Sequence, residues 1–120
     1  MNRYWEWRRL EDAVERSQAP FFFSKDAMAY FNSRRVHLPI QAEDGSVYFI
    51  TSERFKGFGR VPDGERRYTV RRFVDGRIVE VGGFQQFRSI PKAKQALERA
   101  SAMKNPTSQA LKDLADEICA

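Results

Sequence analysis

The chain of 120 residues contains one cysteine, Cys119, and one histidine, His37. A single cysteine cannot form an intrachain disulfide, and a lone thiol is typical of proteins that work in a reducing cytoplasm. Zinc sites are built from three or four histidine, cysteine or carboxylate ligands, and these two side chains fall short of the usual sets. We therefore expect no metal, no cofactor and no thiol chemistry.

Long apolar runs are also missing. None approaches the roughly 18 residues that a membrane-spanning helix needs, and the segment MNRYWEWRRLEDAVERS has charges where a signal peptide would be apolar. Neither a G-x-x-x-x-G-K-[ST] motif nor a dinucleotide-binding glycine motif is present. The carboxylates are scattered among arginines, so ion pairing is their simplest role, with a paired-carboxylate site as a minor alternative. These absences predict a cytoplasmic protein that is not an enzyme and has no catalytic residue.

Apolar residues at helical spacing predict a helix near each end of the chain. Trp7, Leu10 and Val14 share one helix face within residues 3–18. The last segment, residues 107–118, has the same amphipathic pattern. Its apolar stripe consists of Leu111, Leu114, Ala115 and Ile118. Residues 21–100 are expected to form an α+β core, and residues 1–120 to form one domain.

Capping residues and turn residues divide this core. Ser24 is a candidate N-cap for a short helix over residues 25–33, and Ser89 is a candidate N-cap for a longer helix that has Pro91 in its first turn. Asp44-Gly45 indicates a turn, and the β-branched and aromatic residues that follow it predict a strand over residues 47–51.

A β-hairpin is predicted around Asp75-Gly76, the favoured dipeptide of a two-residue type I′ turn. This turn would pair Arg71 with Glu80 and Val70 with Val81. We expect an antiparallel sheet of about three strands with helices against one face, and we expect that face to carry Val70 and Val81. Phe84 and Phe87 follow Gly82-Gly83 and are expected to pack beneath the next helix.

The surplus of positive charge is centred on the hairpin and on the helix that follows it. The net charge is +5, with fifteen arginines against six lysines, and residues 61–100 alone carry +4. Guanidinium groups bind phosphate and carboxylate in a bidentate manner, so the arginines could bind an acidic partner. They could equally form a solvated sheet face that resists aggregation. The candidate binding residues are Arg66, Arg67, Arg71, Arg72, Arg77, Arg88, Lys92, Arg34 and Arg35.

Three segments carry a family resemblance: FFFSKDAMAYFNSRRV, VYFITSERF and RRYTVRRFVDGRIVEVGGFQQF. Together they resemble a small family of uncharacterised proteins encoded by tailed phages and prophages, over roughly residues 21–100. That family has no established activity, so no residue inherits a role from it. The resemblance implies a setting, because small phage accessory proteins often act by binding DNA or a host defence machine, as anti-CRISPR proteins do.

Three functions are therefore expected to compete. The first is an anti-CRISPR-like inhibitor that binds a host or phage nucleoprotein complex in the host cytoplasm. The second is a regulatory protein that binds DNA or RNA directly through the arginine-rich hairpin. The third is an oligomeric structural phage component, such as a homodimer joined through the terminal helices.

Overall fold

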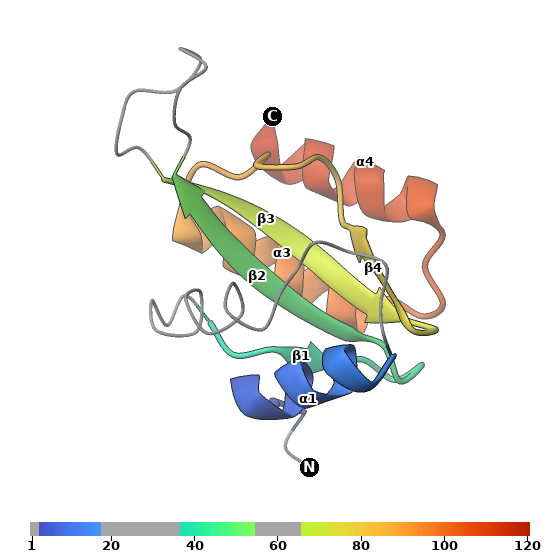
Figure 1. Cartoon of the computed structure of the whole chain (residues 1–120). Coiled ribbons are helices and arrows are strands. Elements are labelled where there is room, and N and C mark those ends of the chain that lie inside the picture. The colour runs from blue at the N-terminus through green and yellow to red at the C-terminus, as the bar shows by residue number, and fades with distance from the viewer. Residues whose placement is uncertain (1–2, 18–36, 55–65) are drawn as a thin grey trace.

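The computed structural model describes residues 3–17, 37–54 and 66–120, without the side chains of residues 53, 54 and 66. These residues form three helices and a four-stranded antiparallel sheet in the order β1-β2-β3-β4 (Figure 1). The elements are α1 (Trp7–Ser17), β1 (Ile40–Gln41), β2 (Val47–Arg54), β3 (Arg66–Val74), β4 (Arg77–Glu80), α3 (Ile90–Ala102) and α4 (Ser108–Cys119). The α+β class is confirmed, with four strands in place of about three. The helix predicted over residues 25–33 lies outside the described residues.

The β3–β4 hairpin has the predicted register. Arg71 pairs with Glu80 and Val74 with Arg77, and the backbone N–H of Val81 donates to the carbonyl of Val70 at 2.8 Å. Asp75 and Gly76 have φ values of 52° and 73°, and positive φ at both central residues is the requirement of a type I′ turn. The local sequence therefore determines this part of the sheet.

The first helix begins later than predicted, at Trp7 and not at residue 3. Residues 3–5 are extended and pair with the β1 strand. The N–H of Trp5 donates to the carbonyl of Pro39 at 2.9 Å, and the N–H of Gln41 donates to the carbonyl of Arg3 at 2.8 Å. These bonds satisfy backbone groups at the edge of the sheet, which a longer helix would leave unpaired.

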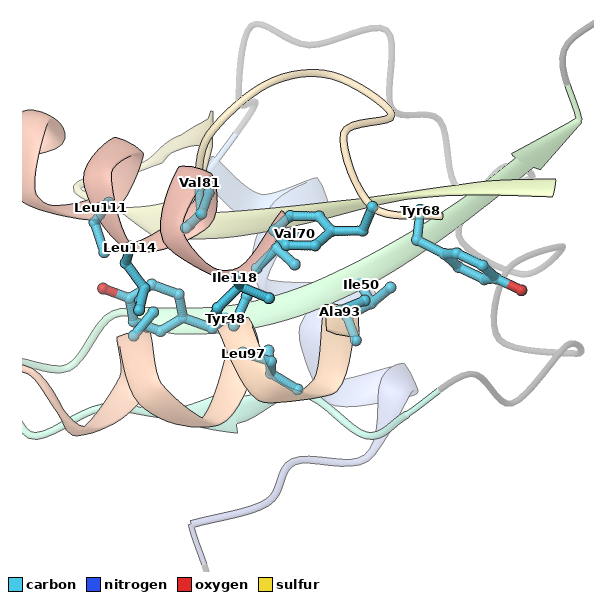
Figure 2. Packing of buried hydrophobic residues seen from close by; sticks show 14 of the residues in the cluster. Tyr48, Ile50, Tyr68, Val70, Val81, Ala93, Leu97, Leu111, Leu114 and Ile118 are labelled. Atoms are coloured by element: carbon cyan, nitrogen blue, oxygen red, sulfur yellow. The ribbon is translucent and has the colours of Figure 1, made fainter. Parts of the chain in front are cut away.

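One face of the sheet packs against α3 and α4 (Figures 1 and 2). Tyr48 and Ile50 of β2 and Val70 of β3 are fully buried there against Leu97 of α3. Both helices begin with a side-chain cap: Ser89 Oγ accepts from the N–H of Lys92, and Thr107 Oγ1 accepts from the N–H of Ala110. The predicted cap at Ser89 is confirmed. Ser89 and Thr107 fix where each helix starts and so help to align its apolar stripe with the sheet.

The opposite face of the sheet packs against α1. Trp7 and Leu10 are buried against Val47 and Phe49, and the Trp7 and Phe49 rings meet edge to face at 6.1 Å. The expectation that helices cover only one face was therefore wrong. The physical reason is the alternation of side chains in β2 and β3: both faces carry apolar residues, so both need a helical cover.

The apolar stripe of α4 is used within the chain. Leu111, Leu114 and Ile118 are 2%, 6% and 8% exposed and belong to the same cluster as α3 and the sheet. Figure 2 shows all three side chains directed toward the sheet. A homodimer through this stripe would thus have to compete with the protein's own core. Among the described residues, no helix has the length and apolar character needed to cross a membrane.

Candidate functional site

The candidate binding residues whose side chains the structure describes do not form one surface. Arg34 and Arg35 lie outside the described residues, and for Arg66 only the backbone position at the start of β3 is described. The others occupy three places: the interior of the sheet, the tip of the hairpin, and the end of the sheet where β3 begins. Each place gives the basic side chains a different environment and a different capacity to bind.

Arg71 is buried inside the molecule, only 2% exposed, on the sheet face that also carries Phe49. Its Nε donates to Thr51 Oγ1 at 3.0 Å, and its Nη1 lies 3.6 Å from a carboxylate oxygen of Glu80. A guanidinium in this position holds β2, β3 and β4 together. It does not present charge to a macromolecular partner.

Arg72 points to the other face and is also paired. Its Nη2 lies 2.7 Å from Asp44 Oδ2, and its Nε donates to Ser46 Oγ at 3.3 Å. Burial raises the pKa of Asp44, but hydrogen bonds from Ser46 and Arg72 outweigh it and hold that pKa below its usual value. The carboxylate is therefore ionised at neutral pH and neutralises Arg72. Arg71 and Arg72 leave the sheet by opposite faces, so they could not serve one ligand.

Arg77 is exposed at the hairpin tip, next to the Asp75-Gly76 turn. It lies at the far end of β3 from Arg67, because Arg77 pairs with Val74 and β3 runs from Arg66 to Val74. Seven residues of strand between Arg67 and Val74 correspond to about 23 Å. Arg77 is therefore separate from the remaining basic residues.

The other end of the sheet gathers Arg67, Arg88 and Lys92, which we call the basic end. Tyr68 and Phe87 pair through two backbone hydrogen bonds of 2.8 and 3.1 Å. Extending this antiparallel register by one residue brings Arg88 opposite Arg67. Lys92 lies in the first turn of α3, which Figure 1 shows beginning beside the start of β3.

The electrostatics of the basic end favour an anion. Arg88 and Lys92 are exposed, and neither forms an ion pair with a described residue. The dipole of α3 adds partial positive charge at the start of the helix, where Lys92 lies. By contrast, Arg99 and Lys112 on α3 and α4 are paired with Glu117 and Asp116. Arg88 and Lys92 are thus two exposed cations of the basic end that have no ion-pair partner among the described residues.

Two hollows in the described surface lie away from the basic end. A groove of about 350 Å³ between α3 and α4 is lined by Arg99, Met103, Ala110, Asp113, Leu114 and Glu117. A second hollow of about 270 Å³ is lined by Glu43, Asp44, Lys104 and Asn105. Within residues 3–17, 37–54 and 66–120, no group of three or more His, Cys, Asp or Glu side chains is arranged to hold a metal ion.

His37 packs edge to face on Tyr4, with the ring centroids 5.7 Å apart. Its pKa is lowered by burial and by the charge of Lys94. The imidazole is consequently neutral at pH 7.

Phe84 does not pack beneath α3, so this prediction was wrong. Phe87 is fully buried as expected, but Phe84 is 47% exposed. The difference arises at Gly82, whose φ of 86° and close approach to Ala115 turn the chain outward before Phe87 returns to pair with Tyr68. The Gly82-Gly83 pair was the only sequence signal of this turn, and it does not specify which phenylalanine is left outside.

Comparison with known proteins identifies the family. Residues 8–98 match a family of unknown function (DUF7447), which is more than half of the chain, so the protein belongs to this family. The match includes nearly all of α1, the sheet and the basic end, whereas α4 lies beyond it. No curated protein and no solved structure matches the chain. The resemblance to phage-encoded proteins stays a prediction.

Proposed function

We propose that this member of the DUF7447 family is not an enzyme and acts by binding, with its basic end placed on the nucleic acid of a nucleoprotein complex. The carrying observation is that Arg88 and Lys92 are exposed and without an ion-pair partner among described residues, next to Arg67. Half or more of the hydrogen bonds in protein–nucleic acid interfaces go to the backbone, and Arg and Lys supply many of them.

The specific form of the proposal is an inhibitor of a host defence complex, anti-CRISPR-like, that acts in the host cytoplasm. This form is supported by the resemblance of three segments to phage accessory proteins and by the small size of the chain. A regulatory protein that binds free DNA or RNA through the same surface is the second candidate. This second candidate differs from the inhibitor in its partner, which would be nucleic acid alone and not a nucleoprotein complex.

The test is the salt dependence of binding to fluorescently labelled nucleic acid, measured by anisotropy. Both labelled duplex DNA and a single-stranded oligonucleotide would be used at about 50 to 200 mM salt. For duplex DNA, the logarithm of the affinity should fall with the logarithm of salt by about 0.9 per phosphate neutralised. The double substitution R88E/K92E should weaken binding and reduce this slope by about 2.

The matched control is R77E, which reverses an exposed charge at the opposite end of β3. R77E should leave the slope unchanged within error. R88E/K92E should not destabilise the fold, because both side chains are exposed and a glutamate at position 92 would suit the first turn of α3. Equal losses in R77E and R88E/K92E would show that only net charge matters and would contradict a specific basic end.

The proposed inhibitor function is tested by a second experiment, the retention of a complex from host lysate. The wild-type protein should retain a nucleoprotein complex from host lysate, R77E should retain it equally, and R88E/K92E should lose it. Nuclease treatment distinguishes the two candidates: a defence complex would stay bound through its protein contacts, whereas a free nucleic-acid partner would be lost. Retention of no partner by the wild type would count against the inhibitor.

A further inference from the structure

Phe84 is held outside the core by a loop of fixed shape. The N–H of Gln85 donates to Thr69 Oγ1 at 2.8 Å, and the N–H of Gly83 donates to Gln86 Oε1 at 2.6 Å. Gln86 Nε2 in turn donates to Asp116 on α4 at 3.0 Å. These bonds tie the loop to β3 and to α4, so the exposed ring projects from a rigid support.

One face of the Phe84 ring is occupied. The Cζ atom of Arg71 lies 5.7 Å from the ring centroid, within the range of a cation–π contact. Arg71 is itself held in place by its contacts with Thr51 and Glu80, so it supports the Phe84 ring in a fixed position. The residue as a whole is 47% exposed, so Phe84 remains accessible to a ligand despite its contact with Arg71.

The Phe84 ring and Arg67 of the basic end lie along one face of the sheet. Arg67, Thr69 and Arg71 alternate with the buried residues Tyr68 and Val70, so they share the face opposite to α3. The Phe84 loop contacts both Thr69 and Arg71 on that face. Arg67 precedes Arg71 by four residues, about 13 Å along the strand.

An aromatic ring beside cations is the arrangement that binds single-stranded nucleic acid. Unpaired bases expose their faces and stack on aromatic side chains, while Arg and Lys follow the phosphates. Duplex DNA offers no exposed base face except at its ends, so it would use the basic end but not the ring. A protein partner could bury Phe84 as well, but aliphatic side chains would serve it nearly equally.

We propose that Phe84 is a stacking platform for one unpaired base, and that the partner of the basic end is single-stranded DNA or RNA. This inference rests on the proposed function and specifies its ligand. Phe84 contributes the base contact, Arg71 supports the ring from below, and Arg88 contacts the backbone of the strand. The site reads no particular base, because every base has a π face.

The experiment compares a labelled oligo(dT) and a labelled duplex of the same length for wild type, F84A, F84L, F84Y and R88E. F84A should weaken oligo(dT) binding roughly 5- to 100-fold and leave duplex binding within about twofold, because one stacked base is lost. F84L should fail to restore binding, since leucine fills similar space without a π face. F84Y should restore it. Equal unfolding midpoints would confirm that the variants fold.

Each outcome decides the matter. Loss with F84A and F84L and rescue with F84Y support the stacking platform. If R88E weakens both ligands and F84A weakens neither, the inference fails while the proposed function stands. If F84L restores binding, Phe84 is an apolar contact and the inference fails in the same way. If wild type binds neither ligand at low salt, both the inference and the direct nucleic-acid contact are overturned.

Discussion

The guanidinium of Arg72 binds the carboxylate of Asp44 at 2.7 Å and thereby joins the middle of the sheet to the β1–β2 turn. Asp44 Oδ1 also accepts from the N–H and the hydroxyl of Ser46, so the turn and the arginine share one carboxylate. The Arg72 Cζ atom lies 5.7 Å from the centroid of the buried Tyr48 ring. Asp44 thus holds the β1–β2 turn and Arg72 of β3 in place next to the buried Tyr48 ring.

Asp44→Asn should lower the free energy of unfolding by about 1 kcal/mol at pH 7. The pKa of Asp44 is lowered in the folded state, so the unfolded chain takes up the proton first as the pH falls. The contribution of this carboxylate is therefore complete above about pH 5 and is lost as the pH falls below the unfolded value near 3.9. Urea denaturation should show a larger difference between wild type and Asp44→Asn at pH 7 than at pH 2.5. Glu43→Gln, at an exposed neighbour, is the control.

Arg71→Ala should lower the free energy of unfolding by about 3 kcal/mol, because it leaves a cavity beneath Phe84 and removes the partner of Glu80 and Thr51. Arg71→Met keeps the volume of the side-chain stem and should recover at least half of the loss. Thermal denaturation would measure both. Arg77→Ala, at an exposed position, should stay within about 0.5 kcal/mol of wild type. A similar small loss in Arg71→Ala would contradict a structural role for Arg71.

Gly82→Ala should be more harmful than Gly45→Ala, although both glycines have φ near 90°. A Cβ at Gly45 would meet nothing within 4 Å, whereas a Cβ at Gly82 would lie 2.5 Å from the Cβ of Ala115. We expect a loss of about 1 kcal/mol at Gly45 from backbone strain alone, and a further 1 to 3 kcal/mol at Gly82. Chemical denaturation of the two variants would measure the difference. Equal losses would mean that the loop shifts freely from α4.

Leu111→Ala should destabilise the protein by about 2 to 4 kcal/mol at every protein concentration, because the side chain is buried in the protein's own core. A homodimer joined through this stripe would behave differently: its stability would rise with concentration. Denaturation at two concentrations differing a hundredfold would separate these cases. Gln109→Ala, on the exposed side of α4, is the control.

Local signals in the sequence predicted the parts of the fold that depend on neighbouring residues. The type I′ turn at Asp75-Gly76 and the cap at Ser89 are determined within a few residues, and both were found where expected. The role of Tyr4 and Trp5 was missed, because their pairing partners lie near Ile40, more than thirty residues along the chain. No short-range periodicity encodes such a contact.

The two-sided sheet had a signal that could have been used. In β3, Val70 marks one face as apolar and Phe73 marks the other, while two arginines fall on each face. A half-exposed strand would have kept its apolar residues on one face, so a mixture on both faces indicates a sheet covered twice. The candidate site was harder to predict, since Arg71 and Arg67 are both arginines on the same face of β3. Only the contacts of Arg71 with Thr51 and Glu80 assign it to the interior.

Strand β2 contributes to both hydrophobic clusters of the protein. Tyr48 and Ile50 belong to the cluster with α3 and α4, and Val47 and Phe49 belong to the cluster with α1. Detachment of α1 would expose one face of the strand whose other face packs against α3. The protein should therefore melt in a single cooperative step, with amides of β2 among the last to exchange with deuterium. A partner that binds the sheet face covered by α1 should therefore also slow amide hydrogen exchange in the elements on the opposite face, including α4.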